Sequence, residues 1–125
     1  DLIWCTKEEE LDGVTAISGS GPAYVFRFIE ALTEAGLRYG FNDVQAKRMA
    51  IATVLGSAEL AKRSGESPSV LREKVTSKGG TTYEALKVMN DRHFMEMMQD
   101  AMDACKKRAV ELGDAFHESV EASNK

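Results

Sequence analysis

Cysteine and proline are scarce in this chain, with two of each among 125 residues. Cys5 and Cys105 are too few for the disulfide framework of a small secreted domain, and neither has a second cysteine or a histidine at metal-ligand spacing. His93 and His117 each stand alone in the sequence, which favours surface histidines over a metal site. These shortages predict a cytoplasmic protein with reduced thiols and no bound metal.

An excess of basic residues is missing as well. Sixteen Lys and Arg stand against twenty Asp and Glu, which gives a formal net charge of −4 and a sequence pI of about 5.2. Nucleic acids and anionic membranes are bound by basic faces that neutralise phosphates. We therefore expect neither a nucleic-acid partner nor a membrane partner.

Long apolar runs are also missing. The longest uncharged stretch, residues 13–26, contains three glycines and Pro22, and it is shorter than the roughly 20 apolar residues of a membrane span. No cationic and then apolar leader opens the sequence, which begins at Asp1 rather than Met. This start predicts a mature or trimmed fragment.

What the chain does contain is typical of one folded helical domain. Hydrophobic residues make up 43% and charged residues 29%. Glycines and the two prolines divide the sequence into about five predicted helices, and the fold class is all-α. The only strand-like run is Leu2–Cys5, which has no second strand to pair with. The predicted helices cover residues 22–39, 42 or 43 to 63, 68–76, 82–90, and a long segment from about residue 92, which Gly113 either ends or only weakens.

The second of these helices carries the signal for association. From Met49 to Ala58 it has no charged residue on any side. A helix that is apolar all round has to be covered on several sides, and five helices in a short chain can barely do this. The pattern predicts at least a dimer.

A glycine-rich segment near the N-terminus superficially matches a dinucleotide-binding fingerprint. Gly19 and Gly21 precede a predicted helix, but Tyr24 stands where the third glycine belongs, and no second strand with an acidic end follows. Instead of a dinucleotide-binding loop, we favour a flexible, glycine-containing segment that leads into the helix and packs on a neighbouring element.

The loop Ser77–Thr82 is a better candidate binding site. Gly79 and Gly80 let the backbone approach a ligand, and the first amides of the helix that follows have no intrahelical partner. With the helix dipole, they form a seat for a carboxylate or a phosphate. Thr81 and Glu84 match a capping box, which predicts Thr81 as the N-cap. Ser77 and Thr82 then keep free hydroxyls, and Lys78 adds charge.

The residues of this region allow two other interpretations. A plain, well-capped turn is as consistent with the residues as an anion seat. A helix-turn-helix that presents Tyr83, Glu84 and Lys87 to DNA is poorly compatible with the acidic net charge.

Two motifs, in this order, resemble one known family. They are Leu11-Asp12-Gly13-Val14-Thr15-Ala16-Ile17-Ser18-Gly19-Ser20-Gly21-Pro22-Ala23-Tyr24-Val25-Phe26 and Leu71-Arg72-Glu73-Lys74-Val75-Thr76-Ser77-Lys78-Gly79-Gly80-Thr81-Thr82. Together with the segment between them, they look like the C-terminal domain of pyrroline-5-carboxylate reductase, over about residues 8–113. That family reduces 1-pyrroline-5-carboxylate to L-proline with NADPH or NADH.

The resemblance implies an architecture and a set of site residues. Its members have an N-terminal Rossmann domain for the cofactor and a helical C-terminal domain that forms an interleaved homodimer, and these dimers often assemble into a decamer. By resemblance, Ser77 and the amides of Gly80 and Thr81 hold the substrate carboxylate, beside Gly79. The Thr82 hydroxyl meets the ring nitrogen and is the implied catalytic group.

Two departures from the family pattern are visible. Lys78 replaces a residue that is usually proline, and the Rossmann domain is missing, so no cofactor-binding residue is expected in this chain. Residues 1–10 are then the end of the cofactor domain and a linker, and 11–125 are the helical dimerisation and substrate-binding domain. We expect such a fragment to be inactive by itself. The alternative is a helical dimerisation module with no ligand role.

Overall fold

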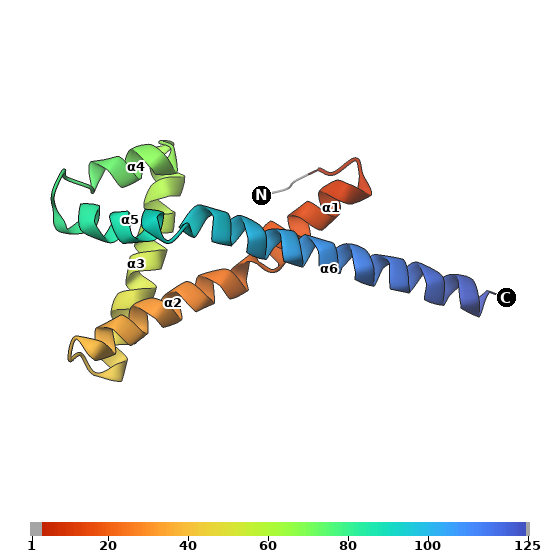
Figure 1. The fold of residues 1–125 in the computed structure, drawn as a ribbon, viewed down its shortest axis with the longest axis horizontal. Coiled ribbons are helices and arrows are strands. Elements are labelled where there is room, and N and C mark those ends of the chain that lie inside the picture. The colour runs from red at the N-terminus through yellow and green to blue at the C-terminus, as the bar shows by residue number, and fades with distance from the viewer. Residues whose placement is uncertain (1–3, 125) are drawn as a thin grey trace. The chain divides into compact units, whose positions relative to one another are not determined.

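The structure is a computed structural model that describes residues 4–124, and in that range every regular element is a helix. The predicted all-α class is confirmed. The elements are α1 (Glu8–Val14), the π-helix η1 (Thr15–Gly19), α2 (Gly21–Arg38), α3 (Asp43–Ser64), α4 (Pro68–Lys74), α5 (Thr81–Asp91) and α6 (Phe94–Ser123) (Figure 1). They form two compact units: α1, η1 and the start of α2 belong with α6, and Val25–His93 form the other.

The N-terminal region differs from the prediction. Leu2 and Ile3 lie outside the described residues, and Trp4 and Cys5 belong to no helix or strand. After them the chain forms α1 and η1, which sequence reasoning missed, so six α-helices and one π-helix replace the expected five. The first acidic turn of α1, Glu8–Glu10, suits a helix N-terminus.

The first unit is built around η1. The amide of Ser20 donates to the carbonyl oxygen of Thr15 at 2.8 Å, across five residues, as in a π-helix. The Tyr24 hydroxyl reaches back to the carbonyl oxygen of Ala16 at 2.9 Å. The sulfur of Cys105, in α6, lies 3.2 Å from Oγ of Ser20, the residue that follows η1. The predicted packed helix entry is therefore found here, in π-helical form.

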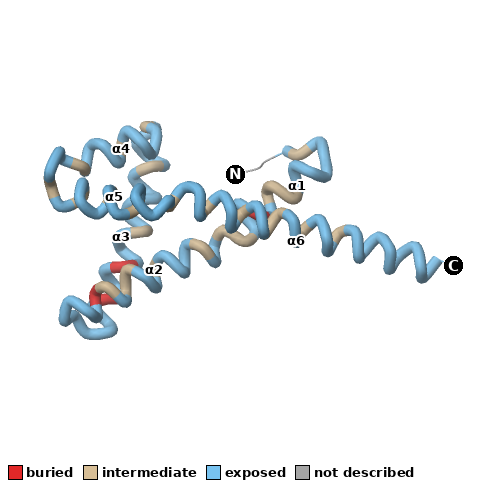
Figure 2. Tube along the Cα trace, in the orientation of Figure 1, coloured by how far each residue is buried: buried red, intermediate tan, exposed pale blue. Residues whose placement is uncertain are grey.

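The second unit contains a close crossing of α2 and α3. A Cβ atom placed on Gly36 would lie 2.9 Å from the Cβ of Ala46, so only glycine fits there. Gly36, Ala46 and Ala50 are buried at this crossing (Figure 2). The small residues of these two helices thus set the separation of their axes.

Helix boundaries follow local sequence signals closely. Asn42 caps α3 by accepting a 2.9 Å hydrogen bond from the amide of Gln45, and Ser67 caps α4 in the same way through Val70. The predicted α2 and α3 are confirmed to within a residue, whereas α4 ends two residues earlier than expected. Gly113 does not end α6, which continues to Ser123.

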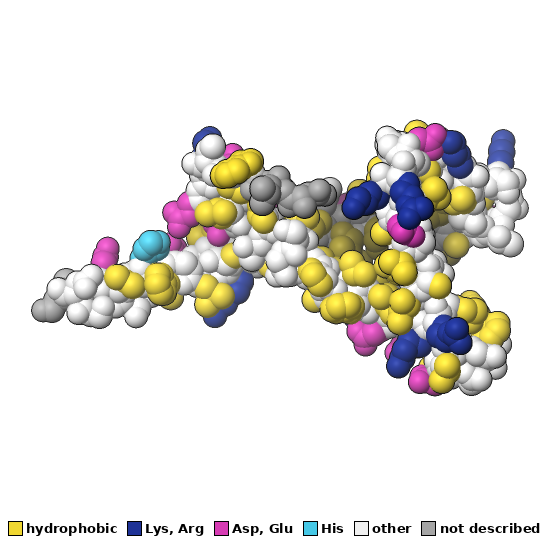
Figure 3. All heavy atoms as spheres, turned by 180° about the vertical axis from the view of Figure 1, so that it is seen from behind, with side chains coloured by type: hydrophobic (Ala, Val, Ile, Leu, Met, Phe, Trp, Pro, Cys, Tyr) yellow, Lys and Arg dark blue, Asp and Glu magenta, His cyan; other side chains and the backbone are white. Residues whose placement is uncertain are grey.

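Little of the single chain is buried. Among the described residues the buried hydrophobic side chains are those of Ala16, Ala46 and Ala50. On the apolar helix α3, Ile51 is 45% exposed and Leu55 is 64% exposed, and Figure 3 shows hydrophobic side chains at the surface of both units on the face in view. None of the helices in residues 4–124 is both long and apolar enough to cross a membrane.

Candidate functional site at the α4–α5 loop

The loop between α4 and α5 has a shape that depends on glycine. Gly79 has a φ of +74°, in the left-handed region that side chains other than that of glycine rarely adopt. The amide of Gly80 donates a 3.0 Å hydrogen bond to the carbonyl oxygen of Ser77 and closes the turn. Gly80 itself is extended, with φ −84° and ψ −177°, and delivers the chain into the first turn of α5.

The N-cap of α5 is Gly80, so the prediction that Thr81 is the cap is wrong. The left-handed Gly79 brings the chain into the helix one residue earlier than the Thr81–Glu84 pattern suggests. The carbonyl oxygen of Gly80 already accepts the helical hydrogen bond from the Glu84 amide at 3.2 Å. Thr81 is therefore the first helical residue, and its hydroxyl is not committed to capping.

Three consecutive amides at this helix start have no acceptor in the part of the chain that the structure describes. They belong to Thr81, Thr82 and Tyr83. Ser77, Gly79 and Thr81 are exposed, and Gly80 and Thr82 are half-buried. Unpaired amides and the positive end of the helix dipole together favour an anion, by about 0.3–1 kcal/mol at an exposed site.

Ser77 and Gly80 are tightly opposed across the turn. A Cβ atom on residue 80 would lie 2.5 Å from Ser77 Oγ and 3.1 Å from the Ser77 carbonyl oxygen. The absence of a side chain at position 80 therefore leaves room for the Ser77 hydroxyl beside the start of α5. The free amides of Thr81, Thr82 and Tyr83 follow directly along the chain.

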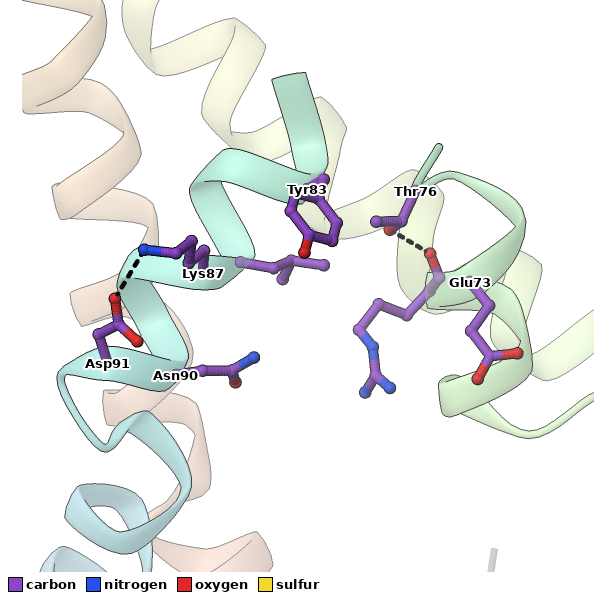
Figure 4. Close-up of a pocket in the computed structure, with 8 residues that line it drawn as sticks. Glu73, Thr76, Tyr83, Lys87, Asn90 and Asp91 are labelled. Carbon is purple, nitrogen blue, oxygen red and sulfur yellow. Dashed lines mark hydrogen bonds and ion pairs between the residues drawn. The ribbon is translucent and has the colours of Figure 1, made fainter. Parts of the chain in front are cut away.

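A polar cleft of about 360 Å³ lies beside the loop, between α4 and α5. Figure 4 shows Tyr83 and Asn90 projecting from α5 into the space that separates it from Glu73 and Thr76, and Lys87 turned toward Asp91. Ser77, Gly79, Gly80, Thr81 and Thr82 are not among its lining residues, so the cleft and the anion seat are neighbours on the same pair of helices. The full lining is Arg72, Glu73, Thr76, Tyr83, Leu86, Lys87, Asn90 and Asp91.

Sequence reasoning did not find this cleft, although a signal for it was present. Tyr83, Lys87 and Asn90 recur at spacings of four and three and so share one face of α5. Each side of the cleft contains one local contact. In α5, Lys87 Nζ lies 3.4 Å from Asp91 Oδ2, and at the end of α4 the Thr76 hydroxyl donates to the carbonyl oxygen of Arg72 at 2.6 Å. These polar groups already have partners within the chain.

A second, apolar groove of about 570 Å³ lies between α2 and α3. It is lined by Phe26, Ile29, Glu30, Thr33 and Glu34 of α2 and by Lys47 and Ile51 of α3. Its exposed lining is mostly apolar, and the two glutamates oppose the binding of a small acid.

The thiol of Cys105 lies in the other unit and is half-buried. Hydrogen bonds from Ser20 and Tyr24 stabilise its thiolate and lower its pKa below the usual range. The hydrogen bond to Cys105, aided by partial burial, raises the pKa of the Tyr24 phenol. Nowhere in residues 4–124 do three or more His, Cys, Asp or Glu residues group as metal ligands would.

Comparison with known proteins gives consistent matches over most of the chain. Residues 8–112 match the family described as pyrroline-5-carboxylate reductase dimerisation. The pyrroline-5-carboxylate reductase of Pseudomonas aeruginosa is 39% identical over 112 residues, which are 90% of this chain and 41% of that protein. The Synechocystis enzyme is 43% identical over 106 residues, 85% of this chain and 40% of that protein.

Solved structures agree with these matches. A pyrroline-5-carboxylate reductase from Coxiella burnetii is 41% identical, with a TM-score of 0.85 over 88% of this chain and 41% of that chain. The Plasmodium falciparum reductase, solved with NADP bound, is 34% identical, with a TM-score of 0.81 over 86% of this chain and 43% of that chain. The chain thus spans about two fifths of the length of its relatives, and it belongs to the pyrroline-5-carboxylate reductase dimerisation family.

Proposed function

We propose that this chain is the C-terminal part of a pyrroline-5-carboxylate reductase, which reduces 1-pyrroline-5-carboxylate to L-proline with NADPH or NADH. Within it, the α4–α5 loop is the substrate-binding half of the active site. The observation that carries the proposal is the set of free amides at Thr81, Thr82 and Tyr83, close in the loop to the Ser77 hydroxyl, in a chain of the reductase family.

The substrate carboxylate belongs at the start of α5. Ser77 donates its hydroxyl hydrogen to one carboxylate oxygen, and the amides of Gly80 and Thr81 face the same anion, with Gly79 shaping the turn. The Gly80 amide is already bonded to Ser77, so the Thr81 amide is the stronger donor of the two. This clamp fixes the ring in one orientation, which is a positioning role.

The Thr82 hydroxyl is placed one residue further along and is the proposed catalytic group. Reduction of a C=N bond requires a hydride at carbon and a proton at nitrogen. A hydroxyl at the ring nitrogen orients the protonated imine and accepts or donates its hydrogen bond as the nitrogen becomes an amine. Thr82 is half-buried in the first turn of α5.

The cofactor is assigned to the part of the protein outside this chain. The Gly19–Gly21 segment is the end of a π-helix and the start of α2, whereas a dinucleotide fingerprint needs a strand before its glycines. The described residues therefore do not fit NADPH or NADH. We place the end of the cofactor domain and the linker in residues 1–10, the helical domain in residues 11–125, and the protein in the cytoplasm.

A homodimer accounts for the exposed apolar surface. Leu55 and Ile51 on α3, Phe26 on α2 and Phe116 on α6 are between 45% and 66% exposed in the single chain. The two units also differ in charge: residues 1–24 and 94–125 carry twelve acidic against five basic residues, and residues 25–93 carry eight against eleven. Opposite charges favour the packing of one unit on the other unit of a second copy. Further association into a decamer would appear in the mass of the full-length protein.

The test uses the full-length protein and its Thr82→Ala and Ser77→Ala variants. Thr82→Ala is expected to lower kcat by about a hundredfold, and Ser77→Ala is expected to raise the KM for 1-pyrroline-5-carboxylate by about tenfold. Ser69→Ala on α4 is the control, because its exposed hydroxyl contacts only Ser67 in the described structure. Wild-type kinetics in both loop variants would overturn the assignment of the site.

The alternative function is that of a dimerisation module that binds no ligand. Experiments on the isolated chain distinguish this function from the proposed substrate-binding role. With substrate and NADPH, the chain alone is expected to show background oxidation, because the cofactor site lies elsewhere. Proline added at high concentration should shift the amide NMR signals of Thr81 and Thr82. A dimeric chain whose loop signals do not move would favour the alternative.

A further inference from the structure

Lys78 is the one loop residue to which the proposed function gives no role. It lies between Ser77 and Gly79 and is exposed. Within residues 4–124 its ammonium forms no ion pair, whereas two neighbouring lysines are engaged: Lys74 Nζ lies 2.5 Å from Glu66 Oε1, and Lys87 is paired with Asp91. Lys78 is therefore a positive charge within the α4–α5 loop that has no ion-pair partner in the described residues.

The position of Lys78 ties its charge to the carboxylate seat. Adjacent Cα atoms are about 3.8 Å apart, and Lys78 directly follows Ser77 and is three residues before Thr81. A flexible lysine stem lets the ammonium come within about one Debye length, roughly 8 Å at physiological salt, of an anion bound at the free amides. The only acidic residue in the first turn of α5, Glu84, opposes anion binding there, and Lys78 offsets its charge.

We propose that Lys78 recruits the anionic substrate to the α4–α5 loop and sets its KM, an inference that rests on the proposed function. The ammonium attracts the carboxylate before and during binding, and it contributes equally to the bound substrate and to the transition state. An interaction of this kind lowers KM and leaves kcat unchanged. Because the lysine is exposed, salt weakens the attraction.

The experiment compares Lys78→Met with Lys78→Arg in the full-length reductase at about 20 mM and about 300 mM salt. Lys78→Met is expected to raise the KM for 1-pyrroline-5-carboxylate by about three- to fivefold at low salt, with kcat unchanged. At high salt the difference should fall below about twofold. Lys78→Arg keeps the charge and should retain the wild-type KM at both salt concentrations.

Lys87→Met is the matched control, because it removes a lysine of the same pair of helices whose charge is already neutralised by Asp91. Its low-salt KM should change less than that of Lys78→Met. An unchanged KM in Lys78→Met, an increase that salt does not reduce, or a failure of Lys78→Arg to preserve the KM would each overturn the role of the charge. If Ser77→Ala raises KM while Lys78→Met does not, only this inference fails; if neither raises it, the substrate site itself is misplaced.

Discussion

Gly36 of α2 lies against Ala46 of α3 so closely that a methyl group on residue 36 would stand 2.9 Å from the Ala46 Cβ. Neither atom is at the end of a flexible side chain, so the two helix backbones would have to separate. This contact fixes the crossing from which α3 continues toward α4 and the loop. The separation of α2 and α3 at this crossing therefore depends on a single glycine.

We expect Gly36→Ala to destabilise the protein by about 1–2 kcal/mol, because overpacking outweighs the gain in helix propensity. Urea unfolding at one fixed protein concentration measures the change. Gly113→Ala in α6 is the control, since a Cβ there has nothing within 4 Å, and it should stabilise the protein by up to about 1 kcal/mol. Equal effects of the two substitutions would show that the crossing tolerates the added methyl group.

Gly80→Ala should impair substrate binding more than folding. Its φ of −84° is allowed for alanine, but the new Cβ would displace the Ser77 hydroxyl from its position. We expect KM to rise by about tenfold with little change in Tm. In a Ser77→Ala background, the same substitution should have a much smaller effect on KM. Additive effects would mean that Gly80 acts independently of Ser77.

The thiolate of Cys105 should form at lower pH in the wild-type chain than in Ser20→Ala. The Ser20 hydroxyl is the largest cause of the lowered pKa of Cys105, because it stabilises the charged form, and Tyr24 is the second. Removing Ser20 therefore raises the pKa and leaves less thiolate at a given pH. Thiolate ultraviolet absorbance, followed against pH in a Cys5→Ser background, reports on Cys105 alone. A curve that does not move would refute the role of Ser20.

Leu55→Asp should reduce the mass of the protein in light scattering. Leu55 is 64% exposed in the single chain, so an aspartate there does not disturb the core of one copy. In a dimer that covers α3, it would bury an unpaired charge. Circular dichroism establishes that the variant keeps its helices. A helical variant with the wild-type mass would place the dimer contact away from Leu55.

Prediction from sequence succeeded where a residue acts on its nearest neighbours. Asn42 and Ser67 cap helices through amides three residues away, so local pattern was sufficient for α3 and α4. It failed at η1, which no local pattern predicted, because the π-helix is supported by Tyr24, eight residues beyond Ala16.

The site shows the same division between local and non-local causes. The free amides at the start of α5 follow from glycines and a helix boundary, and the sequence predicted them. The choice of Gly80 over Thr81 as the cap depends on the positive φ of Gly79, which the Thr81–Glu84 pattern does not reveal. The cleft was missed because Arg72 of α4 and Asn90 of α5 line it together only in the folded chain, and no local pattern places the two helices beside each other.

The left-handed backbone at Gly79 makes the proposed carboxylate-binding segment self-contained. Its donors are main-chain groups and one serine, arranged by the turn and not by distant walls. A designer could graft residues 77–82 ahead of an unrelated helix and transfer a preference for small carboxylates with them, provided that glycine is kept at position 79.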